Sequence, residues 1–546
     1  MDFVFGTYIN DRLKLANHRA NYTGIQHQSR ITPTDPKPGE AVTIDVFTGA
    51  DTPIEHVAVY YTTNEQIPDG KRGIASVGEV VHCHKVQVNW DSLKWGYITH
   101  WQATLPPQAD GTLVQYCISA WRDDGEEMYA DCPLAEDRVQ HEAMLHFGNI
   151  PLNTPFIPHK QSATPIFAYT VDTIEPPTWS KNATIYQIII DRFDPGQGRT
   201  WLQTENMDDV FGGTLWGVHE RLDYISDLGV DCLWLSPIWV SPTYHGYDIA
   251  NYRKVEPRLG GEEALHAVIQ GAHERGMRVL LDMACNHVSD QHPIFAEAFN
   301  NEASPYRSWF TFDAQYEYGY KGFFNVKEMP DIKLSHPPAR DWMIDNALYW
   351  LKEFDIDGYR LDFAHGPGPV FWTYFRRACK AAKPDCLLFG EIIEPPDVLR
   401  RYHGRLDGCL DFPLNDALRQ TYGWGTWTNP QFDDFLQSHR LYFPSDFVMP
   451  AFLDNHDMDR FTHINNDNFE KLEQAVSVQM KQQQPVVILY GSEIGSHHVE
   501  SARDHGLSIG RVPMVWSKEQ NVERLDLYKR HIHQRQKRSA DNDTMV

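Results

Sequence analysis

Two hydrophobic patterns divide the chain at about residue 179. Up to residue 148, short runs alternate apolar and polar residues between Gly, Pro, Asp and Asn; they include AVTIDVFTG, HVAVYYTTN, HKVQVNW, THWQATL and VQYCISAW. Alternation with a period of two indicates half-buried strands, and such closely spaced strands are typical of a sandwich. Residues 1–148 are therefore predicted to form an N-terminal all-β sandwich domain, followed by a Pro-rich linker over 149–178.

Beyond residue 179, short apolar runs alternate with amphipathic stretches. The runs are ATIYQIIIDRF, DCLWLSPI, RVLLDMACNH, GYRLDF, CLLFGEI, GCLDFPLN, FVMPAFLDNHD and PVVILYGSE. Between them lie segments of helical periodicity such as GGEEALHAVIQGAHERG and ARDWMIDNALYWLKEF. Parallel strands need crossover helices, so eight strand–helix units predict an α/β fold, a (β/α)8 TIM barrel, over residues 179–535. A polar tail is predicted over 536–546.

One interval breaks this alternation after the third barrel strand. It contains SPYRSWFTFDAQYEYGYKGFFNV, which is dense in aromatic residues and has no clean strand or helix pattern. A long irregular segment inside a compact domain is usually functional. We therefore predict a small subdomain inserted at about 288–338, over the mouth of the barrel.

Composition and charge narrow the class of protein. The 546 residues exceed what one hydrophobic core supports, and the net charge of −25 argues against nucleic acid and anionic membranes as partners. No apolar run reaches the length of a membrane span, and the first residues lack the pattern of a signal peptide. The eight cysteines are scattered without paired metal spacing. These features predict a cytoplasmic protein with reduced thiols.

Polar residues gather at the predicted carboxyl ends of the barrel strands. Arg360 and Asp362 lie two apart on GYRLDF and therefore share one face of the strand. Glu391 ends the next strand, and Asp457 follows the seventh. Active sites of such barrels lie at this edge, and a structural ion pair does not account for carboxylates ending three separate strands. The same edge is predicted to carry Tyr247, Asp248, Asp282, Asn286, His287, His365, Asn455 and His456.

Four short motifs, DMACNH, GYRLDFAH, FGEI and FLDNHD, carry a resemblance to a known family. In order and spacing they resemble the conserved motifs of the α-amylase family of glycoside hydrolases, and GGTLWGV resembles a further one. The resemblance covers about residues 179–516 and implies a (β/α)8 barrel. The N-terminal β domain is similar to that of the cyclomaltodextrinase- and neopullulanase-like branch. Family members usually carry a β domain after the barrel, which is expected to be absent or truncated here.

The resemblance also implies roles for the residues at the strand ends. Asp362 would be the nucleophile of a retaining mechanism, Glu391 the general acid and then base, and Asp457 the group that holds the distorted sugar. Arg360 would keep Asp362 ionised by lowering its pKa, and Asp282 would brace Arg360. Substrate contacts are implied for Tyr247, Asp248, His287, Arg360, His365 and His456. Among these, Tyr247 would stack on a sugar face, and His287 and His456 would donate hydrogen bonds to the sugar.

The expected substrates are maltooligosaccharides, starch fragments, cyclodextrins or pullulan, cleaved at α-1,4 or α-1,6 bonds through a covalent glycosyl-enzyme. Transfer of the same intermediate to another sugar is the alternative reading, and a non-catalytic glucan-binding protein is a third. Four departures from the family pattern leave linkage specificity open: Thr214, Asn251, Lys333 and Gly366. A homodimer also stays open. Trp90, Trp95, Trp101 and Trp121 of the first domain could bind glucan but are expected in its core.

The chemistry requires no cofactor, but the resemblance raises the question of calcium. Asn286 matches a position that often binds calcium in family members. Calcium takes six to eight oxygen ligands, and the chain contains no DxDxDG loop that would supply them locally. A structural calcium at Asn286 is therefore kept as an open alternative.

Overall fold

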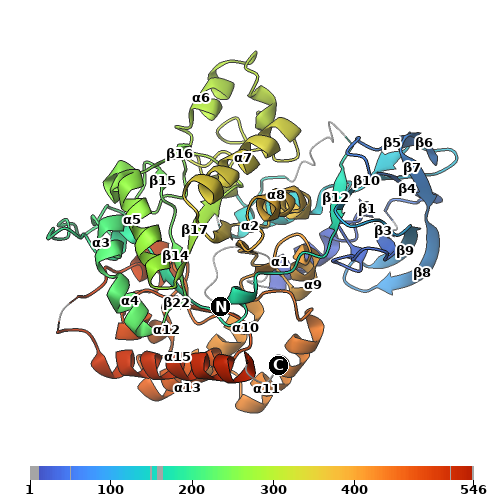
Figure 1. Ribbon diagram of the computed structural model, residues 1–546. Helices are drawn as coiled ribbons and strands as arrows, with labels where there is room; N and C mark the ends of the chain where they lie inside the picture. The colour runs from blue at the N-terminus through green and yellow to red at the C-terminus, as the bar shows by residue number, and fades with distance from the viewer. Residues whose placement is uncertain (1–10, 50, 148–149, 156–163, 517, 544–546) are drawn as a thin grey trace.

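The computed structural model describes residues 11–49, 51–147, 150–155, 164–516 and 518–543. Within them a β-sandwich lies beside a larger α/β unit, and Figure 1 shows the sandwich on the right of the view. The predicted boundary at 148 and 149 and the last predicted tail residues, 544–546, lie outside the described residues.

The sandwich consists of two five-stranded sheets. One sheet has the order β1-β3-β9-β8 with β2 on β3, and the other has β11-β10-β4-β7 with β12 on β10. The five predicted runs form β3 (Val42–Gly49), β4 (His56–Thr62), β8 (His84–Asp91), β9 (Gly96–Leu105) and β10 (Thr112–Trp121). The shorter strands are β1 (Ile25–Gln26), β2 (Ile31–Thr32), β5 (Asp69–Lys71), β6 (Ile74–Val77), β7 (Glu79–His82), β11 (Met128–Tyr129) and β12 (Phe167–Val171). Inward residues such as Val46, Val59 and Ile118 are fully buried between the sheets.

Two predictions about this region are wrong in part. Helices α1 (Asp11–Ala20) and α2 (Ala135–Phe147) stand inside the segment predicted to be all β. Strand β12 falls within the predicted linker, where FAYTV is a short run that follows many Pro and polar residues, yet it is fully buried and pairs along five residues of β10. The sandwich is therefore completed by a strand that comes late in the chain, immediately before the barrel.

The barrel contains the eight predicted parallel strands. They are β13 (Thr184–Ile188), β14 (Cys232–Leu235), β17 (Arg278–Ala284), β18 (Gly358–Asp362), β19 (Leu387–Gly390), β20 (Gly408–Cys409), β21 (Ala451–Phe452) and β22 (Val486–Leu489). Their order is β20-β19-β18-β17-β14-β13-β22-β21, and a parallel bridge between Gly408 and Val448 joins the two ends. Side chains such as Trp234, Leu280 and Phe389 fill the interior, which is a packed core rather than a pore.

Helices surround the barrel strands. They are α3 (Leu215–Glu220), α4 (Leu222–Leu228), α5 (Gly261–Glu274), α7 (Pro337–Glu353), α8 (Gly368–Ala382), α9 (Pro396–Leu399), α10 (Phe412–Leu418), α11 (Asn429–Tyr442), α12 (Phe461–Ile464), α13 (Phe469–Met480), α14 (Ala502–His505) and α15 (Val522–Asp543). A short hairpin of β15 (Trp239–Val240) and β16 (Asn251–Val255) follows β14. Helix α15 continues through residues 536–543 of the predicted tail, and both Arg535 and Arg538 donate hydrogen bonds to the Met480 carbonyl at the end of α13.

The inserted segment begins with α6 (Pro293–Asn300) and continues largely without regular structure to α7. Figure 1 shows it projecting at the top of the view. An aromatic cluster stabilises it: Phe295 contacts Phe310 and Tyr320 at centroid distances of 5.0 and 4.8 Å. Isolated bridges, such as that between His287 and Asp331, tie the segment to the end of β17.

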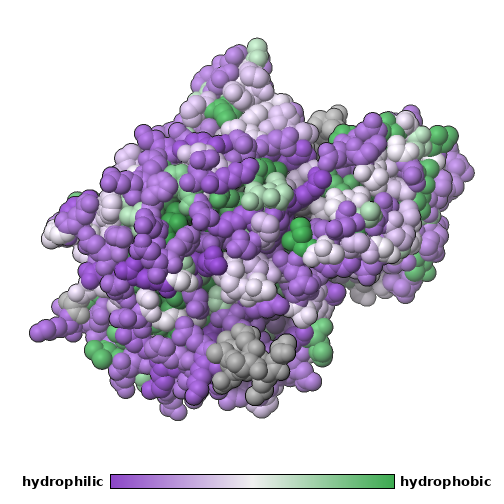
Figure 2. All heavy atoms as spheres, viewed as in Figure 1, coloured by the Kyte–Doolittle hydropathy of each residue, from purple (hydrophilic) through white to green (hydrophobic). Residues whose placement is uncertain are grey.

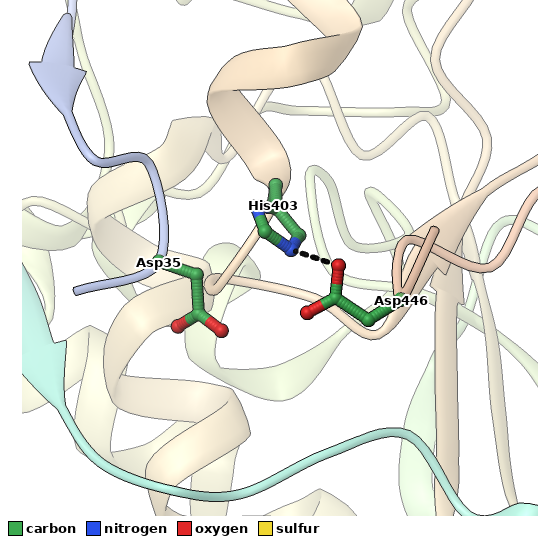
Figure 3. Close-up of side chains that lie close together, drawn as sticks. All are labelled: Asp35, His403 and Asp446. Carbon is green, nitrogen blue, oxygen red and sulfur yellow. Dashed lines mark hydrogen bonds and ion pairs between the residues drawn. The ribbon is translucent and has the colours of Figure 1, made fainter. Parts of the chain in front are cut away.

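A polar junction joins the sandwich to the barrel. Arg405, which is 1% exposed, donates to the carbonyls of Ser29 and Thr34. His403 bonds through Nδ1 to the Thr34 hydroxyl at 2.8 Å and through Nε2 to Asp446 at 3.1 Å (Figure 3). Gly404 has φ +78°, and a Cβ there would meet Asp35 at 2.6 Å, so only glycine allows this approach. The two domains therefore share buried polar contacts.

The cluster of Asp35, His403 and Asp446 has donor atoms close enough to hold a metal ion. However, the Lys37 ammonium already pairs with Asp35 at 2.6 Å, and both ring nitrogens of His403 have hydrogen-bonding partners. These contacts engage Asp35 Oδ2 and the His403 ring without an ion, and only Asp35 Oδ1 of this carboxylate has no hydrogen-bonding partner among the described residues. We therefore assign no metal to the junction.

The surface is mainly hydrophilic, with hydrophobic residues in small separate patches in the view of Figure 2. In the sandwich, Trp101 and Trp121 are buried as predicted, but Trp90 and Trp95 are 49% and 78% exposed, so the core prediction is wrong for these two. All eight cysteines are free thiols. Among the described helices, none combines the length and apolarity needed to cross a bilayer.

Candidate active site

Arg360 organises three carboxyl groups at the carboxyl ends of β17, β18 and β19. Its Nη1 lies 2.6 Å from Asp282 and 2.7 Å from Asp362, and its Nη2 lies 2.8 Å from Glu391. The prediction that Asp282 braces Arg360 is confirmed. The parallel register places Asp282 beside Arg360 on adjacent strands, which is why the chain can pair them so closely. All four side chains are almost completely buried.

Three carboxyl groups sharing one guanidinium carry more negative charge than one cation neutralises. Burial raises the pKa of Asp362 well above its usual range, and the carboxylates of Glu391, Asp282 and Asp457 add to the rise that Arg360 opposes. Burial likewise raises the pKa of Glu391, although Arg360 and the Phe363 N–H, 3.1 Å from Glu391 Oε2, favour its charged form. Arg360 lowers the pKa of Asp362, as predicted, but it does not offset burial and the neighbouring carboxylates, so the net direction is upward. The pair keeps a proton more readily than isolated carboxyls do.

Asp457 is held differently, by two cationic or donor groups. Arg511 Nη2 lies 2.6 Å from its Oδ1, and His456 Nε2 lies 3.0 Å from its Oδ2. Burial alone would raise the pKa of Asp457, but His456 and Arg511 outweigh it and hold that pKa below the usual range. Asp457 therefore loses its proton more readily than the neighbouring Asp362–Glu391 pair does.

The predicted sugar-binding side chains lie in one hydrogen-bonded network. The Tyr247 hydroxyl is 2.9 Å from Asp282 and 2.6 Å from His456 Nε2, and its ring stacks on His456 with centroids 5.4 Å apart. His456 is 1% exposed, and Gln187 bonds to its Nδ1 at 2.6 Å. The structure therefore gives His456 a positioning role toward Asp457, with both ring nitrogens engaged.

His287 is also fully enclosed at the end of β17. Its Nε2 donates to the Tyr247 carbonyl at 3.1 Å, since a carbonyl can only accept, and its buried Nδ1 has no partner among the described residues. Burial lowers the pKa of His287 to about 4, so the ring is neutral. Donation to a sugar from Nε2 is therefore not available while this contact holds, and Nδ1 is left as an acceptor.

Two other predicted substrate contacts differ from each other. Asp248 is 0% exposed and accepts hydrogen bonds from Ser241 and Thr243, so it braces its own loop, and the predicted sugar contact is not supported. His365 is half-buried beside Phe363, at a centroid distance of 6.4 Å. It stays a candidate for substrate contact.

The structure offers a reason for glycine at position 366. A Cβ on Gly366 would lie 2.0 Å from Asn286 Oδ1, so no side chain fits there unless Asn286 moves.

The surroundings of Asn286 also test the fit for calcium. The Asn286 amide donates to Asp331 at 3.0 Å, and the Lys321 ammonium acts electrostatically on the Asp331 carboxyl. The ammonium of Lys321 already balances the Asp331 carboxyl, which would have to be a calcium ligand. The described residues around Asn286 therefore do not fit calcium, and we derive no role for it.

Sequence reasoning missed several residues that complete the site. Arg511 reaches Asp457 from a segment far along the chain, and no local signal marks it. Trp234 donates its indole N–H to Asp282 at 2.9 Å and places its ring 5.1 Å from the Arg360 guanidinium. Gln187 was accessible to sequence reasoning, because a lone amide inside the apolar strand ATIYQIIIDRF needs a buried partner.

Comparison with known proteins agrees with the geometry. A sequence profile described as "Alpha amylase, catalytic domain" matches residues 187–543. "Alpha-amylase 2" of Dictyoglomus thermophilum is 36% identical over 376 residues, which are 68% of this chain and 66% of that protein. "Intracellular maltogenic amylase" of Bacillus subtilis is 32% identical over 383 residues, 67% of this chain and 63% of that protein. The matched part thus spans less than two thirds of either relative.

A solved structure resembles both domains of this chain. The structure named "Cyclomaltodextrinase" has a TM-score of 0.63, covers 94% of this chain and 84% of its own, and is 24% identical. At this identity the likeness shows the fold alone. It extends through the N-terminal sandwich as well as the barrel, which agrees with the predicted two-domain architecture.

Proposed function

This chain belongs to the α-amylase family, and from that premise we propose that it is a retaining α-glucan hydrolase. One observation carries the proposal: a single buried guanidinium, that of Arg360, bonds both Asp362 and Glu391 at the ends of neighbouring strands. A retaining mechanism needs a nucleophilic carboxylate and an acid on the two sides of the scissile bond. The Arg360 guanidinium supports this pairing because it holds the carboxyl groups of Asp362 and Glu391 in fixed positions relative to each other.

Glu391 is proposed as the general acid. Its raised pKa keeps it protonated closer to neutral pH, which a proton donor requires. In the first step Glu391 transfers its proton to the glycosidic oxygen while Asp362 attacks the anomeric carbon. The sugar is then bound covalently to Asp362, and the shortened glucan leaves as an alcohol.

The second step reverses these roles. Glu391, now a carboxylate, removes a proton from water, and the hydroxide oxygen attacks the anomeric carbon while Asp362 departs. Arg360 lies within 2.7 Å of Asp362 and stabilises it as a leaving carboxylate. Asp457 is proposed to accept hydrogen bonds from sugar hydroxyls, and its lowered pKa beside Arg511 supports this role. Two inversions at one carbon return the α configuration.

The relatives bear on substrate and location. Their names, alpha-amylase, maltogenic amylase and cyclomaltodextrinase, support α-glucans such as maltooligosaccharides, starch fragments or cyclodextrins as substrates. We propose cleavage of α-1,4 bonds, with α-1,6 bonds of pullulan as a further substrate, since one relative is named neopullulanase. A cytoplasmic location is proposed in keeping with the relative named intracellular.

The test is a substrate panel with product analysis. The enzyme is incubated with maltotriose, cyclodextrin, pullulan and amylose, and early products are followed by NMR and mass spectrometry. We expect α-anomeric reducing ends from at least one of these glucans. Products longer than the substrate at high maltotriose would instead favour the alternative, transglycosylation. No cleavage of any glucan, or β-anomeric first products, would refute the proposal.

A further inference from the structure

An open groove lies between outer helices of the barrel. Its volume is about 390 Å³, which falls within the range of small-molecule sites. Its walls come from the π-helical turn Arg419–Gly423 and from helices α11, α13 and α15, which Figure 1 shows at the bottom of the view. The lining includes Tyr422, Asn429, Gln474, Ser477 and His531. None of the lining residues belongs to the network around Arg360, so the groove is separate from the candidate active site.

Neutral polar side chains make up most of the lining. Asn429 at the start of α11 and Gln474 and Ser477 on α13 contribute two amides and a hydroxyl. None of these three side chains forms a hydrogen bond with another residue in the part of the chain that the structure describes. Gln474 and Ser477 lie three positions apart and therefore share one face of the helix. The groove thus offers hydrogen-bond donors and acceptors that a ligand can use.

Charge and apolar area argue against two other classes of ligand. The lining contains no lysine or arginine, and its one carboxylate, Glu473, pairs with the Arg530 guanidinium at 3.0 Å. Burial and the nearby Arg530 lower the pKa of His531, which favours its neutral form. An anion therefore finds no cation in the lining, and Val478 and Tyr422 supply too little apolar surface for a hydrophobic ligand. A neutral ligand rich in hydroxyl groups matches this lining best.

Tyr422 adds an aromatic ring to these polar groups. Its ring packs against Phe432 of α11 at a centroid distance of 5.7 Å, which fixes its orientation. The π-helical turn that carries Tyr422 is a rare element, and such turns are frequent at functional sites. An aromatic ring beside amides and a hydroxyl suits a sugar, because the C–H groups of the sugar pack on the ring while its hydroxyls form hydrogen bonds.

The same turn is tied to the loop that carries Asp457. Arg419, which is fully buried, donates to the Leu453 carbonyl at 2.8 Å and to the Asp459 carbonyl at 3.0 Å. These two carbonyls flank Asp457 in the sequence. A ligand held in the groove is therefore kept in a fixed position relative to the active site.

We propose that this groove is a second binding site for α-glucan, which holds one part of a long chain while the active site acts on another. The inference rests on the proposed glucan hydrolysis, because the ligand is a segment of the same class of substrate. Attachment at a second point raises the effective concentration of the chain at the active site without any new catalytic contact. The groove therefore favours amylose and longer starch fragments over maltotriose, which occupies only one site at a time.

Binding is measured with the full-length Asp362→Asn enzyme, which retains the rest of the active site but does not consume the glucan. Affinity electrophoresis in gels that contain soluble amylose gives the dissociation constant. Adding Gln474→Ala should weaken amylose binding by about threefold to tenfold, the range for one hydrogen bond. Ser477→Trp, which fills the groove with a bulky side chain, should weaken it at least as much. Because the active site is the same in all these proteins, the difference reports on the groove.

Gln437→Ala is the matched control, because Gln437 is an exposed amide on α11 that does not line the groove. In the otherwise wild-type enzyme, the two groove variants should lower kcat/KM on amylose relative to maltotriose by a similar factor, and the control should not. Gln474 is exposed and forms no side-chain hydrogen bond among the described residues, so its replacement should leave the melting temperature unchanged. Amylose binding that is unchanged in both groove variants would overturn the inference. Failure of the wild-type enzyme to cleave any glucan would instead refute the proposed function, since the binding measurement does not depend on catalysis.

Discussion

The two ends of the barrel carry two buried ionic clusters of opposite character. At the carboxyl ends of the strands, Arg360 serves three carboxyl groups, those of Asp282, Asp362 and Glu391. At the amino end of β20, Asp407 pairs with Lys380 at 2.7 Å and with Arg376 at 3.5 Å, and Arg376 also contacts Asp172. The second cluster is balanced, with two cations for two carboxylates.

The difference in charge balance indicates that the first cluster is suited to catalysis and the second to stabilising the fold. A balanced cluster satisfies every charge and has no reason to exchange protons. An unbalanced cluster holds a surplus of carboxyl groups in a buried place, which raises the pKa of Asp362 and Glu391 above the ordinary carboxyl range and so favours proton transfer at higher pH. Removing a carboxyl should therefore abolish chemistry at one end and destabilise the fold at the other.

The largest expected effect is on catalysis at the unbalanced cluster. Asp362→Asn removes the nucleophile, and we expect kcat on maltotriose to fall by at least about 10³-fold, because the covalent glycosyl-enzyme can no longer form. Circular dichroism and the melting temperature should stay native. Turnover near that of the wild type would remove Asp362 from the mechanism.

The next effect sharpens the assignment of the acid. Glu391→Gln cannot donate a proton, so we expect natural glucans to lose about 10²- to 10⁴-fold in kcat/KM. An activated aryl maltoside, whose leaving group needs little protonation, should lose far less. Both substrates are measured with the same enzyme preparation, and equal losses would contradict the role of Glu391.

The third prediction tests the balanced cluster. Asp407→Asn leaves Lys380 and Arg376 buried without their shared carboxylate, and we expect the free energy of unfolding to fall by about 3 kcal/mol. Denaturant titration measures the loss. Asp341→Asn is the control, because Asp341 is itself exposed where it pairs with Arg340, and ion pairs of surface carboxylates contribute little. Equal stability of the two variants would remove the contrast between the clusters.

The smallest expected effect concerns pH. Glu391 has a raised pKa in the folded state, so the fold binds its proton more tightly than the unfolded chain does. Wild-type stability should therefore decline as pH rises from the ordinary carboxyl pKa through the raised one. Glu391→Gln has no carboxyl to ionise and avoids that decline, so we expect it to be more stable than the wild type at neutral pH.

The sign should reverse at Asp457. Its lowered pKa contributes stability that is present above the ordinary carboxyl pKa and is lost as pH falls. Asp457→Asn should thus be less stable than the wild type at neutral pH, and the gap should close in acid. Denaturation curves at several pH values compare both variants, and a shared sign would refute this account of the charges.

Much of this arrangement could be predicted from the sequence, because the barrel follows from local rules. Alternating strands and helices indicated all eight barrel strands, and parallel strands bring Asp362, Glu391 and Asp457 to one edge. Arg360 and Asp282 were paired correctly because adjacent strands place them side by side. These predictions needed only the order of the elements.

The rest depended on contacts between distant segments. Helices α1 and α2 are short, and their apolar residues are satisfied by the inserted segment, which no periodicity reveals. Arg511 reaches Asp457 across 54 positions of the chain. Asp248 points inward toward Ser241, whereas Trp90 and Trp95 are exposed. Residue type alone does not specify which way a side chain faces, so these orientations could not be predicted.

The junction of Figure 3 has a consequence for how this protein can be rebuilt or recombined. Thr34 and Ser29 of the sandwich complete the bonding of His403 and Arg405 of the barrel, and Gly404 is shaped to the side chain of Asp35. A sandwich whose backbone follows another path here would withdraw the Ser29 and Thr34 carbonyls from the buried Arg405 guanidinium, and one without the Thr34 hydroxyl would leave His403 Nδ1 without that partner. A functional chimera of this protein must therefore take residues 29–35 and residues 403–405 from the same parent. The two sides of the interface have to be exchanged together, and exchange of the sandwich domain alone is not sufficient.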